Sequence, residues 1–227
     1  MSKINFYDFV KTKKVHNPGF ANHGISIPFR LLIASPSGSG KTNSLLALIY
    51  HFDNSFQEIV VCCKSSSEPL YDLLENKVKN VRIYENGDIP NITEFSKFDE
   101  KTKKYKRIDN LQRLIVFDDL INDKNANKMA AEYYIRGRKL GFSMVYIGQS
   151  YYQIPKIIRD NTQYFILGRN LLNKDLKMIL SAFPSRLALN EFAQLYNDLL
   201  DEPLDTLIIN IEKRNVRKNI TGEIINV

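Results

Sequence analysis

Residues 35–42 read Ser-Pro-Ser-Gly-Ser-Gly-Lys-Thr, and they stand between an apolar strand pattern and an apolar helix pattern. A loop that binds phosphates aims several backbone N–H groups at one point and keeps side chains out of the way, which Gly38 and Gly40 allow. Lys41 then offers an ammonium to the β- and γ-phosphates and Thr42 a hydroxyl to Mg²⁺, while the helix N-terminus adds its dipole. The motif predicts a site for ATP and Mg²⁺ that consists of Ser35, Pro36, Ser37, Gly38, Ser39, Gly40, Lys41 and Thr42.

The residues around this loop decide between a phosphate site and a flexible linker of serine and glycine. The strict pattern has glycine where this chain has Ser35, so the match is to the core Gly-Ser-Gly-Lys-Thr. A phosphate loop follows a strand and opens a helix. Here Leu31, Leu32 and Ile33 precede the loop and an apolar helical pattern follows it. This context favours the phosphate site.

Two adjacent carboxylates form the second half of the predicted site. The apolar run 114–117 is followed directly by Asp118 and Asp119. We expect Asp118 to hold Mg²⁺, directly or through water and Thr42, and Asp119 to orient or deprotonate the attacking water. The alternative is an ordinary turn at the end of a strand, and the loop upstream favours the catalytic interpretation.

A neutral amide is expected at the same edge of the sheet. Gln149 follows the apolar run 144–148, so it falls at the carboxyl end of a strand, where open α/β sheets bind their ligands. Its amide can sense the γ-phosphate or hold water without adding negative charge. The alternative role for this side chain is to cap the strand end.

An arginine-rich turn, Arg136-Gly137-Arg138, lies between a helical pattern and the next strand pattern. Phosphoryl transfer depends on charge stabilisation, and an arginine from a neighbour can raise its rate by roughly 10³–10⁵. We favour Arg138 over Arg136 for this role because Gly137 can end the helix and free the residue after it. Alternatively, both arginines bind surface carboxylates or DNA phosphates. Arg159 and Arg169 are weaker candidates.

Apolar runs rich in Ile, Val and Phe alternate with helical patterns along the chain, which is typical of a parallel sheet covered by helices on both faces. The expected strands are residues 30–34, 58–63, 81–84, 114–117, 143–147, 164–167 and 207–211. The expected helices are residues 42–52, 68–77, 125–136, 154–159, 174–182 and 190–200. Together with the loop, these elements predict an α/β fold of the P-loop NTPase type with a mostly parallel central sheet.

The chain divides into two unequal parts. Residues 1–29 hold two prolines and two glycines without clear periodicity, so we expect an N-terminal arm or capping segment. Residues 30–227 form the expected ATPase domain, because a chain of this length can bury one substantial core. Within it, the charged stretch 99–107 is either a solvated loop or an insertion that faces DNA or another subunit.

Charge and hydropathy indicate which class of partner and which compartment to expect. A net charge of +7 and a pI of about 9.2 favour a polyanion such as nucleic acid, or else a merely basic solvated surface. No apolar run reaches the roughly 18 residues that span a bilayer, and the N-terminus lacks a secretory apolar segment, so we expect a protein kept in the cytosol. Cys62 and Cys63 end an apolar run and are expected to be reduced core residues.

Taken in order, these motifs resemble those of the viral DNA-packaging ATPases of the FtsK/HerA superfamily, the poxvirus-type group of large DNA viruses and virophages. The resemblance covers about residues 30–170. It rests on Pro-Ser-Gly-Ser-Gly-Lys-Thr at 36–42, the stretch 64–71 after the second strand, Asp118-Asp119, Arg-Gly-Arg-Lys-Leu-Gly at 136–141, Gly-Gln-Ser-Tyr-Tyr at 148–152 and Ile-Pro-Lys-Ile-Ile-Arg-Asp-Asn at 154–161.

The resemblance implies a RecA-like fold and a homo-oligomeric ring, commonly hexameric, that uses ATP to thread double-stranded DNA into a preformed capsid. It also implies capsid or membrane-associated virion proteins as partners. The implied location is the host cytoplasm, a viral factory or the virion, without secretion.

Two other classes of function stay open from the residues alone. A P-loop kinase that phosphorylates a small molecule would be monomeric or dimeric and indifferent to DNA. A nucleotide switch or structural module would bind ATP without turnover, an option that Asp119, in place of the glutamate that most motors carry, keeps open. ATP hydrolysis measured with and without DNA separates the three.

Overall fold

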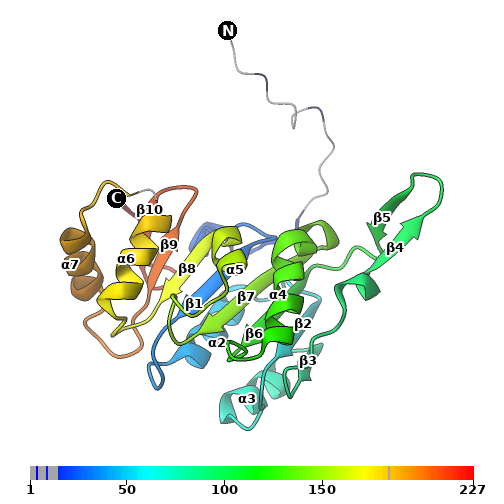
Figure 1. Ribbon diagram of the computed structural model, residues 1–227, viewed down its shortest axis with the longest axis horizontal. Coiled ribbons are helices and arrows are strands. Elements are labelled where there is room, and N and C mark those ends of the chain that lie inside the picture. Colours follow the sequence, from blue (N-terminus) through cyan, green and yellow to red (C-terminus); the bar gives the residue numbers. More distant parts are fainter. Residues whose placement is uncertain (1–3, 5–8, 10–14, 184) are drawn as a thin grey trace.

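The computed structural model describes residues 4, 9, 15–183 and 185–227, and in these residues nine strands form one sheet (Figure 1). Along the chain they are β1 (Arg30–Ala34), β2 (Glu58–Cys62), β3 (Val81–Tyr84), β6 (Arg113–Asp118), β7 (Phe142–Gly148), β8 (Tyr164–Leu167), β9 (Leu207–Asn210), β10 (Asn215–Lys218) and β11 (Ile225–Asn226). Across the sheet the order is β11-β10-β9-β8-β1-β7-β6-β2-β3. The strands from β8 to β3 are parallel, and β9 to β11 add an antiparallel extension, so the mostly parallel sheet is confirmed.

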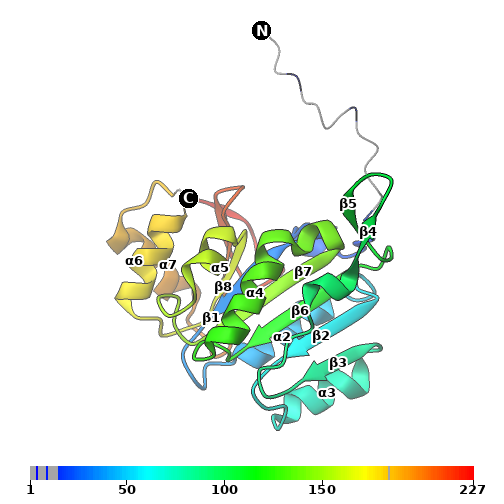
Figure 2. The same ribbon diagram turned by 45° about the vertical axis from the view of Figure 1, so that its right-hand side comes forward.

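Helices cover both faces of the sheet, as the sequence predicts (Figure 2). They are α1 (Phe20–His23), α2 (Lys41–His51), α3 (Pro69–Lys77), α4 (Lys124–Arg136), α5 (Lys156–Asn161), α6 (Asn173–Ala182) and α7 (Leu189–Leu199), with the 3₁₀ turns η2 (Ile92–Phe95) and η3 (Gly137–Leu140). Helices α2 and α3 pack on one face, and α4 to α7 pack on the other.

The coverage of both faces explains the unbroken apolar runs. Every residue of β7 is buried, and alternate side chains enter different cores. Met144 and Tyr146 pack with α4 and α5, whereas Val145 and Ile147 pack with α2. A strand exposed on one face would alternate polar and apolar residues instead.

The expected elements differ from the observed ones by two residues or fewer at their ends, and β1, β3 and β8 have the expected bounds. Before β1, Ile25, Ile27 and Phe29 are buried in the core beside α2. Most of residues 1–14 lie outside the described residues, so the division into an arm at 1–29 and a domain at 30–227 stays a prediction. None of the helices in the described part of the chain has the length and hydropathy that a membrane crossing requires.

A second, smaller sheet stands apart from the first. Strands β4 (Ser96–Asp99) and β5 (Lys104–Arg107) form an antiparallel hairpin that projects from the body (Figures 1 and 2). Residues 99–107 are therefore not a loop throughout, because Asp99 ends β4 and residues 104–107 form β5, but the stretch is largely exposed, as the solvated interpretation expects. The strands of the hairpin lack the apolar run by which the other strands were recognised.

Candidate nucleotide-binding site

The glycine-rich loop joins β1 to α2 at the carboxyl edge of the sheet. Gly38 and Gly40 have φ angles of 74° and 84°, a region that side chains with a Cβ disfavour. At Gly38 an added Cβ would meet no atom within 4 Å, so the backbone angle, not crowding, accounts for glycine there. The loop then enters α2, whose first residue is Lys41.

The structure also explains how the loop tolerates Ser35. This side chain is buried, and its hydroxyl is hydrogen-bonded to that of Ser39, which also bonds to the carbonyl of Pro36. Gly168, just after β8, faces Ser35, and a Cβ there would lie 2.0 Å from the Ser35 Oγ. The Ser35 side chain therefore fits because position 168 is a glycine, which has no Cβ to occupy the same space.

Lys41 points back across the loop. Its Nζ donates a hydrogen bond to the carbonyl of Pro36 at 3.1 Å. Burial lowers the pKa of Lys41, and the charges of Asp118, Asp119 and Glu68 oppose that effect. The ammonium of this half-buried lysine lines the cavity and is a suitable partner for the negative charge of a phosphate group.

Asp118 ends β6 and lines the same cavity as this lysine. Its side chain is 9% exposed, and its Oδ2 accepts a hydrogen bond from the hydroxyl of Tyr71 on α3, which is 1% exposed. Burial raises the pKa of Asp118, whereas the bond from Tyr71 acts to lower it. The phenol therefore stabilises the ionised carboxylate and leaves its second oxygen available.

Glu68 is a further carboxylate at this site. It directly precedes α3, and its Oε2 accepts a hydrogen bond of 2.8 Å from the hydroxyl of Thr42. Residues 64–71 are part of the family resemblance, but the sequence pattern predicts no role for Glu68 or Tyr71. The signal that could have revealed them is strand order: β2 lies beside β6, so the residues that follow these two strands meet at one edge.

The predicted site residues from three strand ends line one cavity of about 300 Å³. Asp119 has a positive φ of 52°, which turns the chain away from β6 as soon as Asp118 is placed. Gln149 reaches the cavity from the end of β7, the strand next to β6. The cavity is lined by Ser37, Gly38, Gly40, Lys41, Thr42, Asn43, Glu68, Leu70, Asp118, Asp119 and Gln149.

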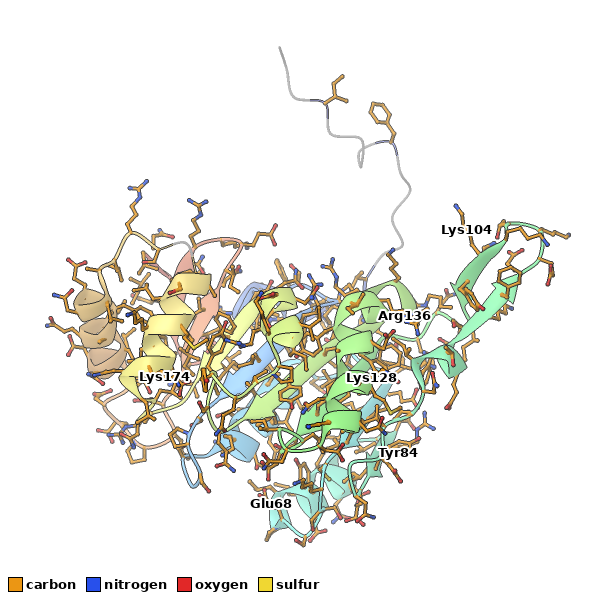
Figure 3. All side chains as sticks on the ribbon, in the orientation of Figure 1. Glu68, Tyr84, Lys104, Lys128, Arg136 and Lys174 are labelled. Atoms are coloured by element: carbon orange, nitrogen blue, oxygen red, sulfur yellow. The ribbon has the colours of Figure 1, made fainter. Side chains whose placement is uncertain are left out.

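The structure does not bring Arg136 or Arg138 to this cavity. Both lie before β7, at the amino edge of the sheet, and the seven residues of β7 separate them from Gln149 by roughly 20 Å. Arg136 is paired with Glu132 at 3.1 Å and lies at the end of α4 (Figure 3). Arg159 lies over the ring of Tyr151, also outside the cavity lining. Arg169 follows Gly168 at the carboxyl edge, and it does not line the cavity either.

The oxygen donors in the cavity fit a magnesium ion that is bound together with a nucleotide. Mg²⁺ is held in such sites by one or two carboxylates, a hydroxyl, phosphate oxygens and water. Thr42 and Asp118 supply a hydroxyl and a carboxylate. Over the described part of the chain, no group of three or more His, Cys, Asp or Glu side chains could hold a metal ion on its own. The residues thus suit a metal that arrives with phosphate ligands.

Comparison with known proteins gives a consistent picture. The model of the family described as Poxvirus A32 protein matches residues 20–209. No significant match was found among curated proteins.

Among solved structures, the genome packaging NTPase B204 from Sulfolobus turreted icosahedral virus 2, in complex with ATP-gammaS, is similar with a TM-score of 0.56 and 12% identity over 86% of this chain and 98% of that one. The type VII secretion ATPase EccC of Thermomonospora curvata has a TM-score of 0.56 and 11% identity over 85% of this chain and 25% of that one. EssC from Geobacillus thermodenitrificans has a TM-score of 0.52 and 12% identity over 81% and 38%. At these identities, the structural likeness supports the fold.

Proposed function

Because this chain belongs to the Poxvirus A32 protein family, we propose that it is an ATP-hydrolysing motor that drives double-stranded DNA into a viral capsid. The family match confirms the resemblance to poxvirus-type packaging ATPases that the motifs indicate. The observation that carries the proposal is the convergence of Lys41, Asp118 and Gln149 on one cavity beside the phosphate loop. The B204 structure with ATP-gammaS supports the same use of the fold.

In this proposal the backbone of residues 38–42 and the ammonium of Lys41 bind the phosphates. Thr42 and Asp118 would hold Mg²⁺, which neutralises charge on the β- and γ-phosphates when it is bound. The bond from Thr42 to Glu68 uses the hydroxyl proton and so leaves the hydroxyl oxygen free to face a metal. Tyr71 has the matching effect on Asp118, since it occupies one of the two carboxylate oxygens. Glu68 and Tyr71 are therefore positioning residues.

Asp119 and Gln149 are proposed to act on the attacking water. Asp119 is exposed to the cavity and can accept a proton or a hydrogen bond from water, and Gln149 can hold the same water or contact the γ-phosphate. The two side chains come from neighbouring strands, β6 and β7, so their spacing is fixed by the sheet. The positive φ of Asp119 is a strain that such a role can justify.

A second subunit is proposed to complete the site. Among the described residues, the cavity lining contains Lys41 but no arginine, and Arg138 lies at the opposite edge of the sheet. In a ring, of which a hexamer is the expected form, the amino edge of one subunit can face the nucleotide of the next. Arg138, or failing that Arg136, would then act on the neighbour's γ-phosphate. We further propose that the ring acts in the cytoplasm or viral factory of the host, docked on a capsid or virion membrane protein.

The decisive experiment is ATP hydrolysis by the purified protein with and without double-stranded DNA, combined with its mass in solution in the presence of nucleotide. Hydrolysis by an oligomer that DNA stimulates is the expected result. Hydrolysis by a monomer or dimer that ignores DNA would replace the motor with a phosphotransferase. ATP binding without any turnover, with and without DNA, would replace it with a nucleotide switch.

A further inference from the structure

The projecting hairpin concentrates the positive charge of the chain. Residues 96–107 contain six basic side chains and two acidic ones, a net charge of +4 within a chain whose net charge is +7. Lys104 lies on this β4–β5 hairpin, called the hairpin arm or simply the arm below, which extends from the body of the protein (Figure 3). More than half of the excess charge is thus placed on twelve residues that stand away from the rest of the protein.

The two faces of the hairpin have different chemistry. On one face Lys97 lies opposite Lys106, and Asp99 lies opposite Lys104. On the other face Phe98 lies opposite Tyr105, with their ring centroids 5.2 Å apart. The hairpin therefore has a basic face and an aromatic face.

Neither face is explained by the stability of the hairpin itself. Phe98 and Tyr105 are 44% and 72% exposed, so the aromatic pair has no core to cover it. Like charges placed directly opposite, as at Lys97 and Lys106, destabilise a strand pair, and two strands alone are only marginally stable in water. These features are those of a surface that meets a partner with negative charge.

Most of the lysines on the arm are available for such a partner. Lys106 is paired with Asp99, and Lys103 with Glu100 at 2.9 Å. In the described residues, Lys97, Lys101 and Lys104 have no acidic partner within ion-pair distance, and all three are exposed. Each can bind an external anion without giving up an internal ion pair.

The base of the hairpin is closed by hydrogen bonds and packs against η3. The guanidinium of Arg107 donates to the carbonyl of Leu111, and the N–H of Ile108 donates to the carbonyl of Phe95 at 3.2 Å. Gly141, with a φ of 89°, admits this arginine: a Cβ there would lie 2.2 Å from the guanidinium. The turn η3, which carries the exposed Arg138 and Lys139, packs against the same base.

From these observations, and on the basis of the function proposed above, we propose that the β4–β5 hairpin is an arm that grips the phosphate backbone of double-stranded DNA. A two-stranded ribbon has the width that the DNA major groove admits. Unpaired lysines on it contact phosphates whatever the base sequence, which suits a protein that must move along DNA.

The test compares two triple variants that each remove three positive charges. The arm variant is Lys97→Ala, Lys101→Ala and Lys104→Ala, and the control is Lys79→Ala, Lys174→Ala and Lys177→Ala. Lys174 lies at the other end of the molecule from Lys104 (Figure 3). A third variant, Lys97→Arg, Lys101→Arg and Lys104→Arg, keeps the charge. Affinity for a fluorescent DNA duplex is measured over a series of salt concentrations, together with ATP hydrolysis and mass in solution.

In the arm variant, the slope of log affinity against log salt should become shallower by about 3, or about 1 for each lost phosphate contact. Stimulation of hydrolysis by DNA should fall, while hydrolysis without DNA stays unchanged. The control and the arginine variant should keep the slope of the original protein. An equal decrease of the slope in the arm variant and the control would overturn the proposal, because DNA binding would then depend on the total charge and not on the position of the lysines.

Two further results would separate the arm from the motor. In one result, the unmodified protein binds DNA and is stimulated by it, and the arm variant has the same slope of log affinity against log salt. This result would overturn the proposed role of the hairpin and leave the proposed motor function unaffected. Loss of the oligomer in the arm variant, at an unchanged slope, would make the hairpin a contact between subunits instead. A protein that neither binds DNA nor responds to it would refute the motor and the arm together.

Discussion

Replacing Tyr71 with phenylalanine should raise the Mg²⁺ concentration needed for ATP binding by about 10- to 100-fold. The change removes one hydroxyl, which donates to Asp118 Oδ2. Both side chains are buried, so water cannot readily take the place of the lost donor. A hydrogen bond to a charged group contributes about 1.5–3 kcal/mol, and each 1.4 kcal/mol changes an equilibrium constant about tenfold. Loss of outer partners of metal ligands typically has an effect of about this size.

The assay is displacement of a fluorescent ATP analogue at a series of free Mg²⁺ concentrations, followed by hydrolysis at saturating Mg²⁺. Tyr133→Phe is the matched control, because Tyr133 is equally buried and donates to the carbonyl of Pro90 at 2.8 Å, away from Asp118. At saturating Mg²⁺ the Tyr71→Phe variant should recover most of its hydrolysis. The same Mg²⁺ requirement in both variants would refute the reasoning, because the phenol would then contribute to packing and not to the carboxylate.

The other predictions concern nucleotide, water, subunit contacts and pH. Lys41→Ala should abolish ATP binding, which equilibrium dialysis checks; retained hydrolysis at the original rate would remove the site assignment. Asp119→Asn should keep ATP binding and lose at least about 100-fold in hydrolysis, and a variant that fails to bind ATP would make Asp119 structural. Arg138→Ala should be inactive alone but partly active when mixed with Lys41→Ala subunits, whereas absence of rescue would count against action on a neighbour. Burial, with the charges of Arg217 and His51, lowers the pKa of His23 to about 4. Between pH 6.5 and 4, His23 is therefore protonated in the unfolded chain and neutral in the folded chain. The free energy of unfolding should fall by up to about 3 kcal/mol as the pH is lowered through this range. Chemical denaturation at several pH values checks this, and a His23→Gln variant should lack that part of the slope.

The fold was largely predictable because the buried strands are nearly continuous apolar runs. The phosphate loop, the acids after β6 and the amide after β7 could be recognised since each directly follows such a run. Their convergence follows from parallel strands, whose carboxyl ends share one edge. The sequence pattern does not show which strands are neighbours in the sheet.

Tyr71 and Asp118 are 47 positions apart, and only the β2–β6 pairing makes them partners. The same reason hid Glu68, whose bond to Thr42 depends on where α3 begins. The hairpin was missed as secondary structure because five of its eight strand residues are charged, with Phe98 and Tyr105 as the only apolar residues in them. The role of Arg136 or Arg138 at a neighbouring subunit stays a prediction, because both lie at the opposite edge of the sheet from the cavity.

Strand β6 follows the hairpin after the connecting residues 108–112 and ends at the cavity. Arg113 at its start bonds to Glu58 and, with both terminal nitrogens, to Asp109, and Asp118 at its end reaches the phosphate loop. All six residues are buried between β2 and β7, so this rod of roughly 20 Å can neither bend nor slide alone. Under the proposed motor function, a pull on the hairpin would therefore move this chain as one rigid body.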